Sequence, residues 1–267
     1  ARSSINSNIM PQGKPSIVLV PGAYALPDLY VRVTTRLASL GYEVHTIRLS
    51  SVAPSDGPLP EPGTMYDDAA VIAREINQLV EQGKEVVVLA HSYGGMPASQ
   101  SIQGLVKREG SEHAGGVVQL AYMTAVVPPE GKSSIDVLAN GPSMDISVDE
   151  KGWMSLVDTA AVAAAAFSDV PPDEGMTWAQ QFTHHSAASM ANPLTYAGYK
   201  DVPVAYLLCT EDLVIPAEVQ QKMIDTVASE GGQEVGVTRI ATGHVPVASA
   251  PELVVDWILR ILSREDK

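Results

Sequence analysis

The sequence predicts a three-layer α/β fold, in which a mostly parallel sheet lies between two layers of helices and one mainly helical insertion interrupts the chain. Short apolar runs alternate with stretches of helical periodicity, the order typical of βαβ units. Most of these runs are apolar throughout, as expected for strands buried on both faces of a parallel sheet. The runs stop near residue 121 and resume near residue 202, which locates the insertion.

Six apolar runs, mostly rich in β-branched residues, predict the strands. Cys209 ends the fifth of them and is the only cysteine. It therefore has no partner for an internal disulfide, and we interpret it as a buried small hydrophobe rather than a nucleophile. The predicted strands are SIVLV (16–20), EVHTI (43–47), EVVVL (85–89), GVVQLA (116–121), VPVAYLLC (202–209) and EVGVTRI (234–240).

Three stretches between and after these runs predict helices. Residues 28–41 carry apolar side chains at helical spacing and end in glycine, a common helix stop. Residues 64–83 begin with Thr64 as a candidate cap, have acidic residues in the first turn and also end in glycine. Residues 251–265 predict a final amphipathic helix.

The positions of the strands and breaks divide the chain into a core and a cap. We expect residues 15–127 and 199–267 to form the core, and residues 128–198 to form a mainly helical cap over the carboxyl edge of the sheet. Residues 1–14 are polar and lack an apolar secretory segment, so we interpret them as a flexible leader. A signal peptide that has already been removed is the open alternative.

Composition and charge narrow the classes of partner. The chain has 267 residues, 45% of them hydrophobic, and a net charge of -14. A field of that sign repels phosphate backbones, so we expect no nucleic acid partner. No apolar stretch is long enough to span a bilayer. We therefore expect no membrane partner and a cytoplasmic location. The sequence does not indicate an oligomeric state.

The stretch LAHSYGG (89–95) places Ser92 directly after a predicted strand and before two glycines. A serine becomes a nucleophile when it is exposed on a tight strand-to-helix turn between small residues and a base takes its proton. Ala90 stands where the usual motif has glycine, which weakens a strict match. A helix N-cap serine is the alternative reading of Ser92 alone.

A base and an acid follow Ser92 at the ends of later strands. His244 lies in TGHVP, after the last predicted strand and before the last helix. Asp212 follows the preceding strand and is predicted to orient the imidazole, with neighbouring Glu211 as the alternative. Parallel strands bring their carboxyl ends to one edge of the sheet, so we expect a Ser92–His244–Asp212 triad there.

The remaining histidines are poorer candidates for the base. His45 lies in a strand pattern and is expected in the core, whereas the side chain of His91 is expected to point away from the tip of the turn. His113 lies in a polar loop. His184 and His185 belong to the insertion, and either could line a pocket.

An oxyanion site requires backbone N–H groups aimed at the developing negative charge. We expect one from Tyr93, the residue after the serine, and one from Ala23, after the first strand, where Gly22 permits a close approach of the backbone. An ordinary turn is the alternative reading of this second segment. No metal or organic cofactor is needed, and we expect a small, mostly apolar substrate. The predicted pocket residues are Gly22, Tyr24, Met123, Trp153, Trp178, His185 and Val245.

These segments also carry a family resemblance. LVPGAY, LAHSYGG, CTEDLVIP and TGHVP resemble the landmarks of the α/β-hydrolase superfamily, from about residue 15 to the end of the chain. Within it, the chain is similar to the small branch of plant methylesterases, hydroxynitrile lyases and related microbial esterases. The resemblance implies that Ser92 is the nucleophile, His244 the base and Asp212 its orienter, with Ala23 and Tyr93 as oxyanion donors.

Two positions favour ester or lactone hydrolysis over cyanohydrin cleavage within that branch. The lyases carry threonine and lysine where this chain has Gly22 and Val245. A carbon–carbon bond-forming or bond-cleaving reaction of secondary metabolism on the same triad remains the alternative. A ligand-binding module that has lost catalysis is a third hypothesis.

Overall fold

The computed structural model describes residues 13–110 and 114–263. Of the predicted leader, residues 1–14, only residues 13 and 14 are therefore described. His113 lies outside the described residues. A six-stranded sheet with the order β2-β1-β3-β4-β8-β9 forms the centre, and all of its neighbouring strands pair in parallel. Its strands are β1 (Ser16–Val20), β2 (Val44–Thr46), β3 (Glu85–His91), β4 (Gly116–Met123), β8 (Val204–Cys209) and β9 (Gly236–Ile240). All six predicted strands are confirmed.

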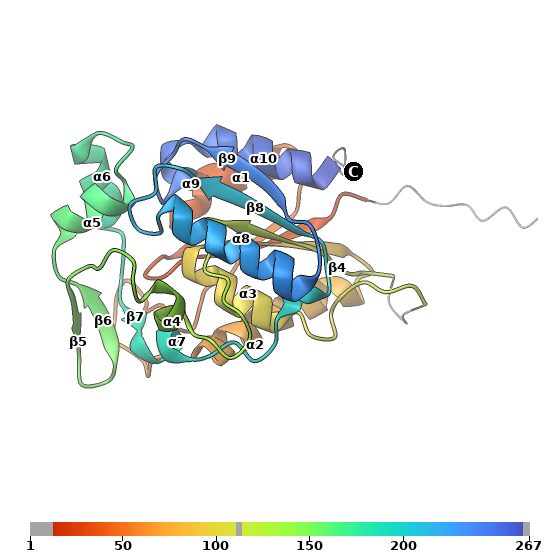
Figure 1. The fold of residues 1–267 in the computed structure, drawn as a ribbon, viewed down its shortest axis with the longest axis horizontal. Helices are drawn as coiled ribbons and strands as arrows, with labels where there is room; N and C mark the ends of the chain where they lie inside the picture. Colours follow the sequence, from red (N-terminus) through yellow and green to blue (C-terminus); the bar gives the residue numbers. More distant parts are fainter. Residues whose placement is uncertain (1–12, 111–113, 264–267) are drawn as a thin grey trace, which may run out of the picture.

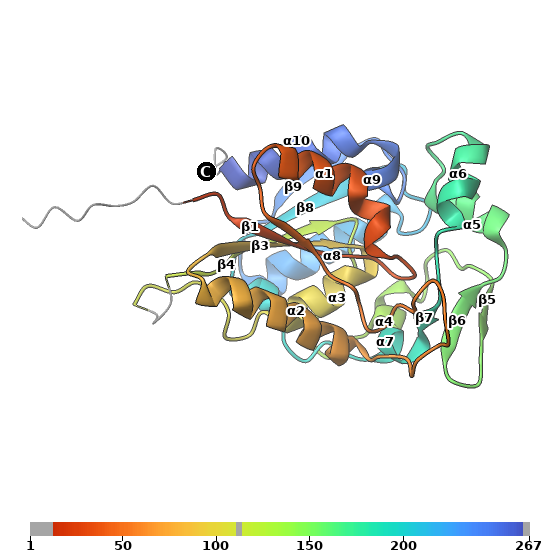
Figure 2. The same cartoon turned by 180° about the vertical axis from the view of Figure 1, so that it is seen from behind.

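Helices cover both faces of this sheet, which confirms the three-layer α/β fold (Figures 1 and 2). One face is covered by helices from the first and last parts of the sequence, and the other face by helices that lie between these in the sequence. The first group is η1 (Pro27–Tyr30), α1 (Val31–Ser39), α9 (Pro246–Ser249) and α10 (Pro251–Ser263). The second group is α2 (Met65–Glu81), α3 (Gly95–Ser101), η3 (Gly198–Lys200) and α8 (Ala217–Gly231).

Alternation along the strands produces the two cores. On β1, Ile17 and Leu19 pack with the side chains of α1 and α10, whereas Val18 and Val20 pack with those of α2, α3 and α8. Successive side chains of a strand point to opposite faces. A strand buried on both faces is therefore expected to be apolar at nearly every position, as Ile17 to Val20 of β1 are.

The predicted helix boundaries have identifiable causes. Thr64 caps α2 through a capping box, since its hydroxyl accepts a hydrogen bond from the Asp67 N–H and the Asp67 carboxylate accepts one from the Thr64 N–H. Gly83 follows the helix at φ +77°, a conformation that glycine adopts without strain.

Residues 128–198 contain both helices and strands. They lie at one end of the sheet, on the left in Figure 1. The three-stranded antiparallel sheet β5-β6-β7 was not expected in a mainly helical segment, because its strands are only two to four residues long. The assignment of this segment to a separate cap stays a prediction. Its elements are α4 (Ser134–Leu138), β5 (Ile146–Val148), β6 (Trp153–Leu156), α5 (Thr159–Ala166), α6 (Pro172–Ala179), β7 (His185–Ser186) and α7 (Ala187–Ala191).

Two further sequence expectations can be compared with the structure. The expectation that His45 lies in the core is wrong: β2 is an edge strand, and the partly exposed imidazole pairs with Glu43 and Glu75 at 3.0 and 2.6 Å. Cys209 is buried, as expected, and burial raises the pKa of its thiol to about 12. Across the described ranges, no helix combines the length and apolar character required to cross a bilayer.

Candidate active site

Three side chains that are far apart in the sequence meet beyond the carboxyl ends of the strands. Ser92 follows β3, Asp212 follows β8 and His244 follows β9. The distance from His244 Nε2 to Ser92 Oγ is 3.0 Å, and that from His244 Nδ1 to Asp212 Oδ2 is 2.7 Å. These contacts form a continuous hydrogen-bonded chain from a hydroxyl through an imidazole to a carboxylate.

A strained turn presents the serine. Ser92 has φ +53° and begins the short helical turn η2 (Ser92–Gly94) that leads into α3. A Cβ atom on Gly94 would lie 2.5 Å from the Pro21 carbonyl oxygen, so the close approach of this turn to the end of β1 requires glycine. In the described residues, the other non-glycine residues with positive φ are Tyr24 and Thr124, which also lie at this site. Each such residue costs on the order of 1–3 kcal/mol, a cost usually retained only at functional positions.

Asp212 is buried and surrounded by donors. Its Oδ2 atom accepts hydrogen bonds from Thr124 Oγ1 and His244 Nδ1, and its Oδ1 atom accepts one from the Ile215 N–H. Burial by itself would raise the pKa of this carboxyl, but the charge of His244 and these hydrogen bonds hold the pKa below its usual value. The neighbouring Glu211 is exposed, so Asp212 is the acid that contacts the imidazole.

The segment predicted to donate to an oxyanion lies next to the serine. A Cβ atom on Gly22 would come within 3.1 Å of Ser92 Cβ, so glycine permits this approach. Ala23 and Tyr93 both line the cavity at Ser92. That their N–H groups bind a substrate oxygen stays a prediction.

Tyr30 and His91 connect the loops of the site, a role that the sequence analysis missed. The Gly22 N–H donates to the Tyr30 hydroxyl (2.8 Å), which lies 2.7 Å from His91 Nδ1. His91 Nε2 lies 2.8 Å from the His244 carbonyl oxygen and must be the donor there. Nδ1 then accepts from Tyr30. Burial lowers the pKa of His91 to about 3, so this imidazole is neutral and the pattern is fixed.

Two buried polar side chains, His185 and Asp68, contact the loops that carry the proposed oxyanion donors. The Tyr24 N–H donates to His185 Nδ1 (3.3 Å), whose Nε2 lies 3.0 Å from Ser189 Oγ. The Tyr93 hydroxyl donates to Asp68 Oδ2 (2.7 Å). Burial lowers the pKa of His185 to about 3 and raises that of Asp68 to about 6.

A cavity of about 310 Å³ opens above the triad and contains several of the predicted pocket residues. Gly22, Tyr24 and Val245 line it. Most of the remaining wall is apolar and comes from α4, β5 and α5 and from the loop after β8. Lining residues that the sequence analysis did not name include Leu138, Met144, Ile146, Leu156, Val162 and Leu213.

Met123 and Trp153 were predicted at the pocket but do not line this cavity. Met123 is fully buried within β4 and packs in the core. Trp153 is also buried, and its indole N–H donates to the Pro60 carbonyl oxygen at 2.9 Å. Both side chains therefore stabilise packing rather than face the cavity.

Trp178 and His185 are likewise absent from the lining of this cavity. Trp178 stacks on Phe167, and the Arg32 guanidinium lies over the Trp178 ring, 4.9 Å from the ring centroid. His185 lies behind Tyr24 and Tyr93, where it supports the wall without reaching its surface. No group of three or more His, Cys, Asp or Glu side chains in the described part of the chain could hold a metal ion.

Comparisons with known proteins agree with this arrangement. The sequence matches the Alpha/beta hydrolase family over residues 17–257. It is 35% identical to the probable hydrolase R7 of Phoma sp., over 92% of this chain and 97% of that protein. It is also 21% identical to the polyneuridine aldehyde esterase of Rauvolfia serpentina, over 91% of this chain and 94% of that protein.

A solved structure shows the same fold. The pyrethroid hydrolase of Sphingobium faniae JZ-2 superposes with a TM-score of 0.74 at 23% identity, covering 94% of this chain and 98% of that one. The predicted resemblance to the small esterase-like branch of the superfamily is confirmed.

Proposed function

Because the chain belongs to the alpha/beta hydrolase family, we propose that it is a serine hydrolase that cleaves a carboxylic ester or lactone of a small, mostly apolar substrate. The observation that carries the proposal is the hydrogen-bonded chain from Ser92 through His244 to Asp212. Relatives named as a pyrethroid hydrolase and an esterase support ester chemistry.

The proposed reaction proceeds in two steps. In the first, Ser92 Oγ attacks the acyl carbon while His244 Nε2 takes its proton, and the ester bond breaks as that proton passes to the leaving alcohol. In the second, His244 takes a proton from water, whose oxygen attacks the acyl-enzyme, and the proton returns to Ser92 as the acid leaves. Asp212 stabilises the imidazolium in both steps.

The cavity supports a small apolar substrate. Its volume of about 310 Å³ is near the lower end of the range for small-molecule sites. Leu138, Met144 and Leu156 contribute to its apolar wall.

Turnover of short p-nitrophenyl esters and lactones tests this proposal. We expect a burst of p-nitrophenol where acylation is the faster step. Ser92→Ala should lower kcat by about 10⁴-fold or more. Ser229→Ala, on an exposed part of α8, is the matched control and should behave as wild type. Absence of turnover on the whole panel, or full activity in Ser92→Ala, would contradict the proposal.

A further inference from the structure

A second cavity adjoins the one at Ser92. It has a volume of about 540 Å³, compared with about 310 Å³ for the inner cavity. The two share a wall of five residues: Ala25, Leu29, Leu156, Val162 and Phe182. The outer cavity therefore lies next to the space at Ser92, on the far side of side chains that a long substrate held at Ser92 would contact.

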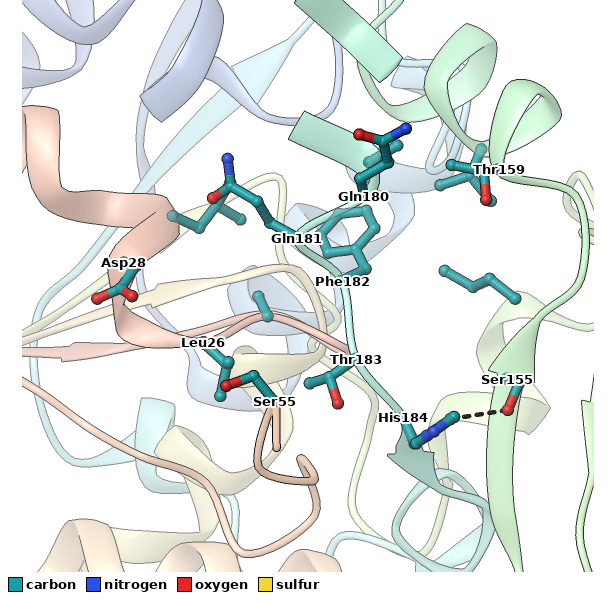
Figure 3. Close-up of a pocket in the computed structure, with 15 residues that line it drawn as sticks. Leu26, Asp28, Ser55, Ser155, Thr159, Gln180, Gln181, Phe182, Thr183 and His184 are labelled. Atoms are coloured by element: carbon teal, nitrogen blue, oxygen red, sulfur yellow. Dashed lines mark hydrogen bonds between the residues drawn. The ribbon is translucent and has the colours of Figure 1, made fainter. Parts of the chain in front are cut away.

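The outer cavity differs from the inner one in its chemistry. Hydroxyl, amide and carboxylate side chains from four separate segments surround it (Figure 3). In that view, Asp28 and Ser55 lie on one side, Thr159 and Ser155 lie on the other, and the chain from Gln181 to His184 runs between them. The polar side chains that face it include Asp28, Ser55, Thr159, Gln180, Gln181 and Thr183.

Several of these polar groups are available to a ligand. Ser155 Oγ and His184 Nδ1 are already engaged, because they form a hydrogen bond of 2.7 Å with each other. Among the described residues, by contrast, the side chains of Thr159, Gln180 and Gln181 make no such hydrogen bond. Amides and hydroxyls both donate and accept, so they suit uncharged groups that contain oxygen or nitrogen.

The charge of the lining restricts the ligand further. Asp28 is an exposed carboxylate, and no lysine or arginine is among the described residues that line the outer cavity. A carboxylate or phosphate group would find no cation there and would face a like charge.

On the basis of the proposed esterase function, we infer that the outer cavity is a subsite for an uncharged, hydrogen-bonding end of the substrate. The ester itself lies in the inner cavity at Ser92. The natural substrate is then amphiphilic: apolar around the scissile bond and carrying hydroxyl, carbonyl or amide groups at its far end, but no acidic group there.

Matched ester series test this inference. In one series, p-nitrophenyl esters of increasing acyl length end in methyl, carboxamide or carboxylate; in the other, acetate esters carry the same ends on the alcohol. In one of the two series, at one chain length, we expect kcat/KM to be about threefold to tenfold higher for the ester that ends in carboxamide than for the ester that ends in methyl. The ester that ends in carboxylate should have the lowest kcat/KM.

Variants assign this preference to the outer cavity. The double variant Thr159→Val/Gln181→Leu should bring the ratio of carboxamide to methyl close to one. Gln103→Leu, an exposed position that lines neither cavity, should retain the wild-type ratio.

Three results would overturn the inference. Equal kcat/KM values for carboxamide and methyl ends at every length of both series would show that the outer cavity is not such a subsite. The same conclusion would follow if the double variant left the ratio of carboxamide to methyl unchanged. In both cases, hydrolysis of p-nitrophenyl acetate would leave the proposed esterase function intact. If p-nitrophenyl acetate and every longer ester are inert, the proposed function fails and the inference fails with it.

Discussion

The sheet-edge loops and the insertion that faces them are built in different ways. Around Ser92, buried side chains fix each loop through hydrogen bonds, and the backbone is strained at three positions. Across the cavity, α4, β5 and α5 contribute mainly apolar side chains, some of them partly exposed, such as Ile146.

This contrast indicates a division of labour. Proton transfer needs atoms held within hydrogen-bond distance of one another, which rigid, buried supports provide. Apolar contacts are not directional and tolerate replacement more easily. The loops at the sheet edge should therefore determine rate, and the insertion should determine which substrate is accepted.

Among the substitutions considered next, the removal of the charge of Asp212, at the sheet edge, should have the largest effect, and this effect should be on kcat. Asp212→Asn replaces the acceptor that fixes the tautomer of His244, and we expect kcat to fall by about 10⁴-fold. Asp256→Asn, on the exposed side of α10, is the control. A kcat within tenfold of wild type would show that this carboxylate does not orient the imidazole.

Asp68, which holds Tyr93, should make stability depend on pH. Burial raises its pKa from an ordinary value of ~3.9 to about 6, which corresponds to roughly 2–3 kcal/mol. Because the folded-state pKa is the higher one, this contribution is fully present below about pH 4 and is lost as the pH rises through about 6. In urea unfolding, the free energy of unfolding of the wild type should fall by this amount between pH 4 and neutrality, relative to that of Asp68→Asn. A difference independent of pH would contradict the assignment.

Tyr30→Phe tests the connection between the loops. The variant leaves the Gly22 N–H without its acceptor and His91 Nδ1 without its donor. Since both groups are buried, we expect the free energy of unfolding to fall by about 1–3 kcal/mol, together with a lower kcat. Tyr42→Phe, at a partly exposed position away from the site, should change neither. Loss of stability without loss of kcat would limit Tyr30 to a structural role.

Substitution on the insertion should give the smallest effect. Ile146 lines the cavity but is 41% exposed, so Ile146→Ala should raise KM for apolar esters by at most about tenfold and change kcat less. Val148→Ala, on the same strand but outside the lining, is the matched control. A large fall in kcat with KM unchanged would contradict the division of labour.

The sequence predicted the sheet well because burial on both faces leaves a strong pattern. Continuous apolar runs located β1, β3, β4 and β8, and the position of each residue after a predicted strand placed Ser92, Asp212 and His244 at the ends of β3, β8 and β9. The carboxyl ends of parallel strands share one edge, so topology brings these residues together without any further signal.

Other features left no such pattern. The strands β5, β6 and β7 are too short for alternation to be visible. For Trp153 and Trp178, residue type indicated burial but not which side of the insertion they face. The role of His91 depends on Tyr30 and on the His244 carbonyl oxygen, partners that are distant in sequence.

Covalent labelling with an organophosphorus reagent, read by mass spectrometry, most directly tests whether Ser92 is an activated nucleophile. We predict a single adduct that peptide mapping places on Ser92, no adduct in Ser92→Ala, and much slower labelling in His244→Ala. An unlabelled wild-type protein, or an adduct on another residue, would contradict the account.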